Sequence, residues 1–161
     1  MTTSHKLFTF IAAGFGSGWL PKAPGTWGTL ASLIPAWFIV SHYSALYLLA
    51  AALPLTALGC FVCMRILPQL QAKDPGWIVI DEWAGQWLCL AVMAQWAAFS
   101  PYLLLLSFLM FRLFDIFKPW PISRLERAGP AWWSIMADDL GAGLLGAVSG
   151  LILWQGAGAL F

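Results

Sequence analysis

The chain has 161 residues, of which 61% are hydrophobic and 9% charged, and its net charge is +1 at pH 7. A soluble domain carries about 25% charged residues, so this chain has too few charges to cover a globular surface in water. A nearly neutral chain also lacks the strongly basic surface that nucleic-acid-binding proteins use. The composition therefore predicts an all-α, multi-span membrane protein that forms a single domain over residues 1–161.

The N-terminal part of the chain does not read as a membrane span. The apolar stretch Leu7–Phe15 has only nine residues, too few to cross a bilayer, so we expect an N-terminal segment that lies at the membrane interface. The next stretch, 16–29, is rich in glycine, proline and threonine and predicts an irregular loop that leads into a helix. Backbone N–H groups at such a place can bind an anion.

Five apolar runs follow, at about residues 28–41, 45–66, 83–99, 102–118 and 139–158. Since a membrane-spanning helix needs about 20 apolar residues, we predict about four to five hydrophobic helices. The first run is short and contains Pro35, which leaves open whether it crosses fully. Cys60 and Cys63 lie inside the second run, where packing explains them better than redox or metal chemistry. Gly146 and Gly150 in the last run allow close packing of helices.

The charged residues lie on one side of this topology. With five crossings, every lysine and arginine falls on the side of the N-terminus or at the helix ends nearest to it: Lys6, Lys22, Arg65, Lys73, Arg112, Lys118, Arg124 and Arg127. All seven acidic residues lie on the same side. Because cytoplasmic loops of membrane proteins carry the excess of lysine and arginine, we expect this side to be cytoplasmic.

Four elements bring possible functional residues to that side: the glycine-rich loop with Lys22, the pair Asp81-Glu82 before the third run, the residues Arg112, Asp115 and Lys118 at the end of the fourth run, and the pair Asp138-Asp139 at the start of the fifth. The spacing i, i+3, i+6 places the three residues of the fourth run on one side of a helix, which Pro119 and Pro121 then end. Helix capping and the helix dipole explain about one acid at each helix start. They do not explain two acidic pairs opposite an aspartate between two cations.

Several carboxylates beside several cations suit the chemistry of phosphate esters. Carboxylate oxygens bind Mg²⁺, which bridges to phosphate oxygens, while arginine and lysine neutralise the remaining charge. The pattern favours phosphate-ester chemistry on a membrane substrate. It leaves open whether the phosphate is hydrolysed or transferred, whether water or an aspartate attacks, and whether one or two metal ions bind.

Four motifs occur in order over residues 14–146: Gly16-Ser17-Gly18 with Pro21-x-Ala23-Pro24-Gly25-Thr26-x-Gly28-Thr29, then Asp81-Glu82-x-x-Gly85, then Phe111-Arg112-x-Phe114-Asp115-Ile116-x-Lys118-Pro119-x-Pro121-Ile122, then Asp138-Asp139-x-x-Ala142-Gly143. Together they resemble the phosphatidylglycerophosphatase A family. The resemblance implies Mg²⁺-dependent hydrolysis of the terminal phosphate monoester of phosphatidylglycerophosphate, giving phosphatidylglycerol and inorganic phosphate. It also implies a role in phospholipid biosynthesis at the cytoplasmic face of the bacterial inner membrane.

The resemblance also suggests a role for each motif residue. We expect metal ligands among Asp81, Glu82, Asp115 and Asp138, and catalytic roles for Asp115, Asp139 and Glu82. The residues expected to bind the phosphate are Lys22, Gly25, Thr26, Thr29, Arg112 and Lys118. The remaining charged loop residues, Asp74, Arg124, Glu126 and Arg127, are expected at the solvated surface, where the two arginines are positioned to meet anionic lipid.

Three other classes of protein remain as alternatives. A transporter usually places its acids near the bilayer midplane rather than at one interface. A lipid phosphotransferase of the alcohol-transfer type carries an Asp-Gly…Ala-Arg…Asp…Asp pattern that this chain lacks. A membrane module that only docks a partner would have no use for the glycine-rich loop. A histidine nucleophile is disfavoured, because His5 and His42 fall on opposite sides of the predicted topology.

Overall fold

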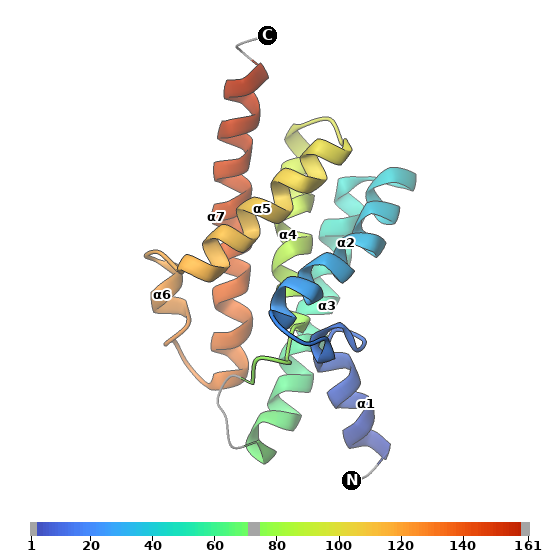
Figure 1. Cartoon of the computed structure of the whole chain (residues 1–161), viewed down its shortest axis with the longest axis vertical. Helices are drawn as coiled ribbons and strands as arrows, with labels where there is room; N and C mark the ends of the chain where they lie inside the picture. Colours follow the sequence, from blue (N-terminus) through green and yellow to red (C-terminus); the bar gives the residue numbers. More distant parts are fainter. Residues whose placement is uncertain (1–2, 71–74, 159–161) are drawn as a thin grey trace.

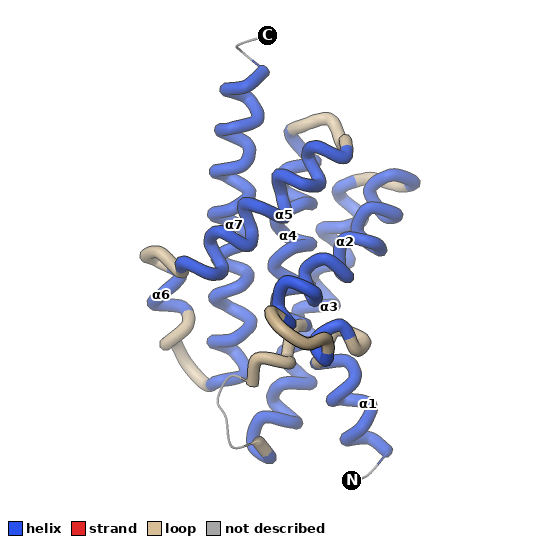
Figure 2. The backbone as a smooth tube through the Cα atoms, in the orientation of Figure 1, coloured by secondary structure: helices blue, strands red, loops and turns tan. Residues whose placement is uncertain are grey.

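The computed structural model describes residues 3–70 and 75–158, and every regular element in this part of the chain is helical (Figure 1). The elements are α1 (Thr3–Ala12), η1 (Ser17–Trp19), α2 (Pro24–His42), α3 (Ala45–Ile66), η2 (Leu67–Gln69), α4 (Ile80–Trp96), α5 (Pro101–Phe117), α6 (Ile122–Leu125) and α7 (Ala131–Gly158), where η marks a short 3₁₀ helix. Short loops and turns join them (Figure 2). The prediction of an all-α protein is confirmed.

Two helices of the described residues are long and apolar enough to cross a membrane, at Ala45–Gln69 and Ala131–Ala157. Helices α4 and α5 are shorter, at 17 residues each. The predicted total of four to five spans therefore stays a prediction, as does the interfacial placement of the N-terminal segment, which forms helix α1.

The helix boundaries differ from the predicted runs at two places that matter for function. The stretch 16–29 is not a loop throughout, because α2 already begins at Pro24 and continues through Pro35. Proline is well tolerated at the first helical position, where its missing N–H has no partner to lose. Helix α7 begins at Ala131, well before the apolar run that starts at residue 139. Both differences move predicted loop residues into helices.

Two connections between helices lie at one end of the molecule. The α2–α3 and α4–α5 connections lie towards the same end as α7's C-terminal turns, and α1 lies towards the other (Figure 1). The predicted grouping of the loops on two sides of a membrane stays a prediction. Lys73 and Asp74, which the sequence places in the connection before α4, lie outside the described residues.

Helix α4 is the centre of the bundle. It packs against α2, α3, α5 and α7, and most of its residues are buried. The indole N–H of Trp87 donates to the backbone carbonyl of Ser32 in α2 over 2.9 Å, which satisfies a polar group that burial would otherwise leave without a partner. The start of α4 is fixed by the N-terminal region, since the N–H of Val79 donates to the carbonyl of Ala12 over 2.9 Å.

Candidate active site

Two glycines bring helices α4 and α7 into contact. A Cβ on Gly143 would overlap the backbone carbonyl oxygen of Gly85, and a Cβ on Gly85 would lie 2.6 Å from the carbonyl oxygen of Asp139. The helices therefore approach backbone to backbone, and the first turn of α4 lies against the acidic part of α7. As a result, Asp81, Glu82 and Asp139 place carboxylate oxygens within 4.8 Å of one another.

The acidic pair of α7 lies inside the helix rather than at its start. Asp138 and Asp139 follow Ala131 by about two turns, so the prediction that they open a helix is wrong. Capping and the helix dipole act only within the first turn and therefore do not explain these two acids. Both are buried, with 4% and 3% of their surface exposed, and a buried charge requires a partner or a metal.

Arg112 links three helices at the edge of this cluster. One of its guanidinium nitrogens, Nη1, lies 2.5 Å from Asp115 Oδ2, 3.9 Å from Glu82 Oε1 and 3.4 Å from the hydroxyl of Thr29. That hydroxyl donates to the carbonyl of Gly25 over 2.8 Å. A Cβ on Gly25 would overlap Glu82 Oε1 and lie 3.3 Å from Arg112 Nη1. The glycine thus leaves room for the ion pair at the start of α2.

Lys118 forms ion pairs at another edge of the cluster. Its ammonium group lies 2.6 Å from Asp138 Oδ2 and 3.3 Å from Glu126 Oε1. Helix α5 ends at Phe117, and Lys118 follows it in the left-handed conformation, with φ 41°. Burial lowers the pKa of Lys118, but the hydrogen bond and charge of Asp138, together with Glu126, raise it above its ordinary value. Lys118 therefore stays charged throughout the physiological pH range.

Three polar atoms at the centre of the site are buried and have no hydrogen-bond partner: Glu82 Oε2, Asp139 Oδ2 and Arg112 Nε. Glu82 and Asp139 line a small pocket of about 100 Å³, whose other lining residues are Asp81, Asp115, Lys118 and Asp138 together with Gly76, Ile78 and Ile135. Five carboxyl groups thus share the site with one lysine in the pocket and one arginine at its edge. Unpartnered carboxylate oxygens in such excess are the donor set that a divalent cation prefers, so the residues present fit Mg²⁺.

The pKa of Glu82 reflects its burial and the charges around it. Burial, together with the charges of Asp139 and Asp115, raises the pKa of this carboxyl group from 4.5 to about 8, although a hydrogen bond with Asp81 and the charge of Arg112 lower it. Glu82 therefore holds a proton at neutral pH unless another cation takes the place of that proton.

The predicted site residues do not all meet in this structure. Asp81, Glu82, Asp115, Asp138, Asp139, Arg112 and Lys118 come together, and Gly25 and Thr29 contact Arg112. Lys22 is exposed before α2, and Thr26 lies in the first turn of that helix. Within the described residues, neither of these two side chains makes a hydrogen bond or ion pair with the cluster.

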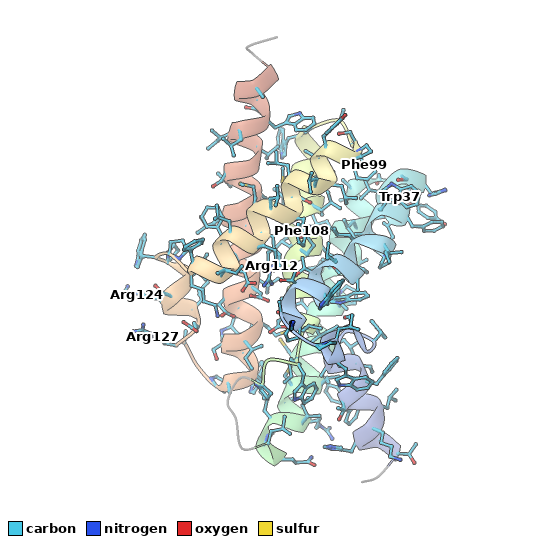
Figure 3. The ribbon with its side chains drawn as sticks, in the orientation of Figure 1. Trp37, Phe99, Phe108, Arg112, Arg124 and Arg127 are labelled. Carbon is cyan, nitrogen blue, oxygen red and sulfur yellow. The ribbon has the colours of Figure 1, made fainter. Side chains whose placement is uncertain are left out.

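Glu126 lies at the surface, as expected, with 46% of its side chain exposed. Its ion pair with Lys118, across Pro119 and Pro121, was not predicted. No local pattern signals this pairing, because the two residues are neither on one helix nor on adjacent strands. Arg124 and Arg127 are exposed, as expected, and project away from the bundle (Figure 3).

Comparison with known proteins gives consistent matches over most of the chain. The profile of the family described as Phosphatidylglycerophosphatase A matches residues 10–154. The chain is 36% identical to Phosphatidylglycerophosphatase A of Escherichia coli (strain K12) over 142 residues, covering 85% of this chain and 77% of that protein. It is 34% identical to the protein of the same name from Haemophilus influenzae, covering 86% and 83%.

A third relative carries a different name. The chain is 33% identical over 137 residues to a protein of Bacteroides thetaiotaomicron that is provisionally named as a phosphatidylinositol-3-phosphatase, covering 83% of this chain and 85% of that protein. No solved structure gives a significant match to the chain. All three names describe phosphatases that act on lipids with a phosphate on the head group.

Proposed function

The chain belongs to the phosphatidylglycerophosphatase A family, and from this we propose that it hydrolyses the terminal phosphate monoester of phosphatidylglycerophosphate. The products would be phosphatidylglycerol and inorganic phosphate. The observation that supports a phosphatase most strongly is the cluster of Asp81, Glu82 and Asp139 between Arg112 and Lys118, in which Glu82 Oε2 and Asp139 Oδ2 have no hydrogen-bond partner.

The proposed cofactor is Mg²⁺, held by Asp81, Glu82 and Asp139. Asp115 and Asp138 line the same pocket and remain proposed ligands, although each is paired with a cation in this structure. When bound, Mg²⁺ would neutralise charge on the phosphate oxygens and polarise a water molecule. Without an added cation, the carboxylates would repel a phosphate dianion.

The remaining residues have roles that follow from their chemistry. Arg112 offers a planar fork with an unpartnered Nε, which suits two phosphate oxygens, and Thr29 and Gly25 hold it in place. Lys118 supplies a second positive charge from the other edge. Asp139, with its free Oδ2, is placed to take a proton from the attacking group or to return one to the glycerol oxygen that leaves. Asp115, which pairs with Arg112, would act as attacking group or ligand.

We also propose where the protein acts. In the predicted topology the lysines and arginines fall on the side of the N-terminus, and by the positive-inside rule this side would be cytoplasmic. The proposal is a multi-pass protein of the bacterial inner membrane that works on lipid in the cytoplasmic leaflet. The two long apolar helices support membrane insertion.

Phosphate release tests the proposal directly. Purified protein in detergent would be incubated with phosphatidylglycerophosphate, with Mg²⁺ or with excess chelator, beside Asp139→Asn. We expect release that needs Mg²⁺ and falls at least about 100-fold in the variant. Phosphatidylinositol 3-phosphate as a second substrate tests the alternative named for the Bacteroides relative. Release that persists in chelator would remove the metal from the proposal, and absence of release from either lipid by folded protein would overturn it.

A further inference from the structure

A groove with an apolar lining lies between α2 and α5, above the candidate active site. Its cavity has a volume of about 330 Å³ and is lined by Leu33, Ile34 and Trp37 of α2 and by Leu104 of α5. Ile34 is 73% exposed and Trp37 is 47% exposed, so the groove is open to the surroundings of the bundle. A polar ligand would find almost no hydrogen-bonding partner in it.

The two helices that line the groove have the same order of residues outward from the site. On α2, Thr29, Leu33 and Trp37 follow one another at steps of four residues, and such residues lie on one face of a helix. On α5, which runs in the opposite direction, Leu104, Phe108 and Arg112 have the same spacing. Figure 3 shows Phe108 between Arg112 below and the level of Trp37 and Phe99 above. Each of these helix faces is therefore polar next to the site and apolar along the two turns that lead away from it.

Helices α2 and α5 are in contact at the site, where Arg112 meets Thr29. Arg112 Nη1 lies 3.4 Å from the hydroxyl of Thr29, and the same nitrogen faces Glu82 and Asp115. From Thr29 to Trp37 the helix rises about 12 Å, which is a large part of one leaflet of about 15 Å. A molecule that lies in this groove with a charged end at Arg112 must be an amphiphile with an apolar chain of that length.

We propose that the α2–α5 groove binds one acyl chain of the lipid substrate while its phosphate lies at the site. This inference rests on the proposed function, which supplies a diacyl lipid with a terminal phosphate. The groove then acts as a specificity element: it aligns a lipid from the side so that the phosphate reaches Arg112, and it contributes binding energy that a substrate without long chains lacks.

Filling the groove tests this inference. Ile34→Trp and Leu104→Trp would be compared with Ile152→Trp, a control on an exposed apolar position of α7 that is not part of the groove. Each would be assayed on dioleoyl phosphatidylglycerophosphate and on an analogue with two four-carbon chains, both in detergent. We expect kcat/KM for the long-chain lipid to fall at least tenfold in the groove variants and to change less than twofold for the short-chain analogue. The control should change neither value by more than twofold.

Each outcome of this comparison either supports or overturns the binding of an acyl chain in the groove. Equal losses on both substrates, or values equal to those of the control, would overturn the inference while leaving the phosphatase intact. If wild-type protein released phosphate from neither substrate, the proposed function would fail instead, so the two failures are distinguishable. Activity on the short-chain analogue also shows that a groove variant is folded.

A labelling experiment separates a bound substrate chain from ordinary surrounding lipid. A non-hydrolysable phosphonate analogue of the substrate, with a diazirine on one acyl chain, would be photolysed on wild-type protein in nanodiscs. We expect labels to concentrate on residues 33–37 and 104–108 and to be displaced by excess phosphatidylglycerophosphate but not by phosphatidylcholine. Labelling spread evenly over the exposed apolar face, or displaced equally by both lipids, would overturn the inference.

Discussion

Gly143 of α7 packs against the backbone carbonyl of Gly85 in α4, with no room for a side chain between them. This contact sets the separation of the two helices that carry the acidic pairs. It also explains why each pair is followed by a glycine after a short interval, at Asp81-Glu82-x-x-Gly85 and Asp138-Asp139-x-x-Ala142-Gly143. The glycines therefore set the distance between the two acidic pairs.

The first prediction concerns this contact. Gly143→Ala should lower the free energy of unfolding by about 1–3 kcal/mol, because the added methyl group forces the helices apart, and activity should fall with it. Gly156→Ala in the same helix is the matched control, since nothing lies within 4 Å of that position. There we expect a neutral or stabilising effect of up to about 1 kcal/mol. Thermal unfolding in detergent and phosphate release measure both. Similar behaviour of the two variants would contradict the role of the contact.

The second prediction is a pH dependence of metal binding. Because the pKa of Glu82 is raised from 4.5 to about 8, the folded, metal-free protein holds a proton that the unfolded chain loses. Stability without metal should therefore fall as the pH rises from about 4.5 to 8. Mg²⁺ must displace that proton, so its affinity should rise by up to about tenfold per pH unit below 8 and then level off.

Calorimetric titration of Mg²⁺ at pH 6, 7, 8 and 9 measures this dependence. Lys118 contributes nothing to it, because its raised pKa keeps it charged at every one of these values. Glu82→Gln should bind Mg²⁺ more weakly and lose part of the slope. An affinity that is independent of pH in the wild-type protein would show that Glu82 is not a ligand.

The third prediction concerns Arg112 and its support. Arg112→Lys should lower kcat/KM by about 10- to 100-fold, because a lysine places a single ammonium where the planar guanidinium contacts both Asp115 and Thr29. Arg124→Lys, at an exposed arginine, is the control and should have little effect. Steady-state kinetics on phosphatidylglycerophosphate distinguish the two. Equal activity of both variants would exclude a specific role for the guanidinium.

The fourth prediction tests the hydroxyl of Thr29 by itself. Thr29→Val keeps the shape of the side chain but removes the group that accepts from Arg112 and donates to the Gly25 carbonyl. We expect a several-fold loss of kcat/KM, corresponding to about 1 kcal/mol for one hydrogen bond. Thr29→Ser retains the hydroxyl and should stay near wild type. If valine and serine behave alike, the hydroxyl does not position Arg112.

The fifth prediction concerns Lys118 and Asp138. Lys118→Met leaves Asp138, whose side chain is 5% exposed, without its cation, and should destabilise the metal-free protein by about 1–3 kcal/mol. The value is below that of a fully buried pair because the Lys118 side chain is 25% exposed. Adding Asp138→Asn should restore part of this loss. Thermal unfolding in chelator gives the comparison, with the exposed Lys6→Met as control, and additive effects of the two changes would argue against the pair.

Hydrophobic patterning predicted most of the helices and misplaced two of their starts. The run 45–66 coincides with α3, because its only charged residue, Arg65, lies in the last turn of the helix. The start of α7 was missed because the acids at 138 and 139 were taken as the first residues of the helix. Pro130, directly before Ala131, is a signal for a helix start. Hydropathy marks where apolar surface begins, and a helix can begin earlier when its polar residues are buried in a site.

The motif residues could be predicted from the sequence, but their pairing could not. Arg112, Asp115 and Lys118 were expected to act together from their spacing alone. They do lie in one site, but Arg112 pairs with Asp115, while Lys118 pairs with Asp138 and Glu126. The contact between Arg112 and Thr29 joins residues that are 83 positions apart in the chain. Such contacts depend on how helices cross, which the glycines decide and local spacing does not.

The short length of α5 has a consequence for the surrounding lipid. At 17 residues, the helix is about 25 Å long, and it runs obliquely across α4 and α7 (Figure 1), so its reach across a bilayer is smaller still. The hydrocarbon layer is about 30 Å thick. We therefore expect the layer to thin beside α5, since a short hydrophobic helix draws the lipid surfaces towards each other. Head groups there would sink towards Arg112, so that the distance between substrate and site is shortened by the membrane and not by the protein.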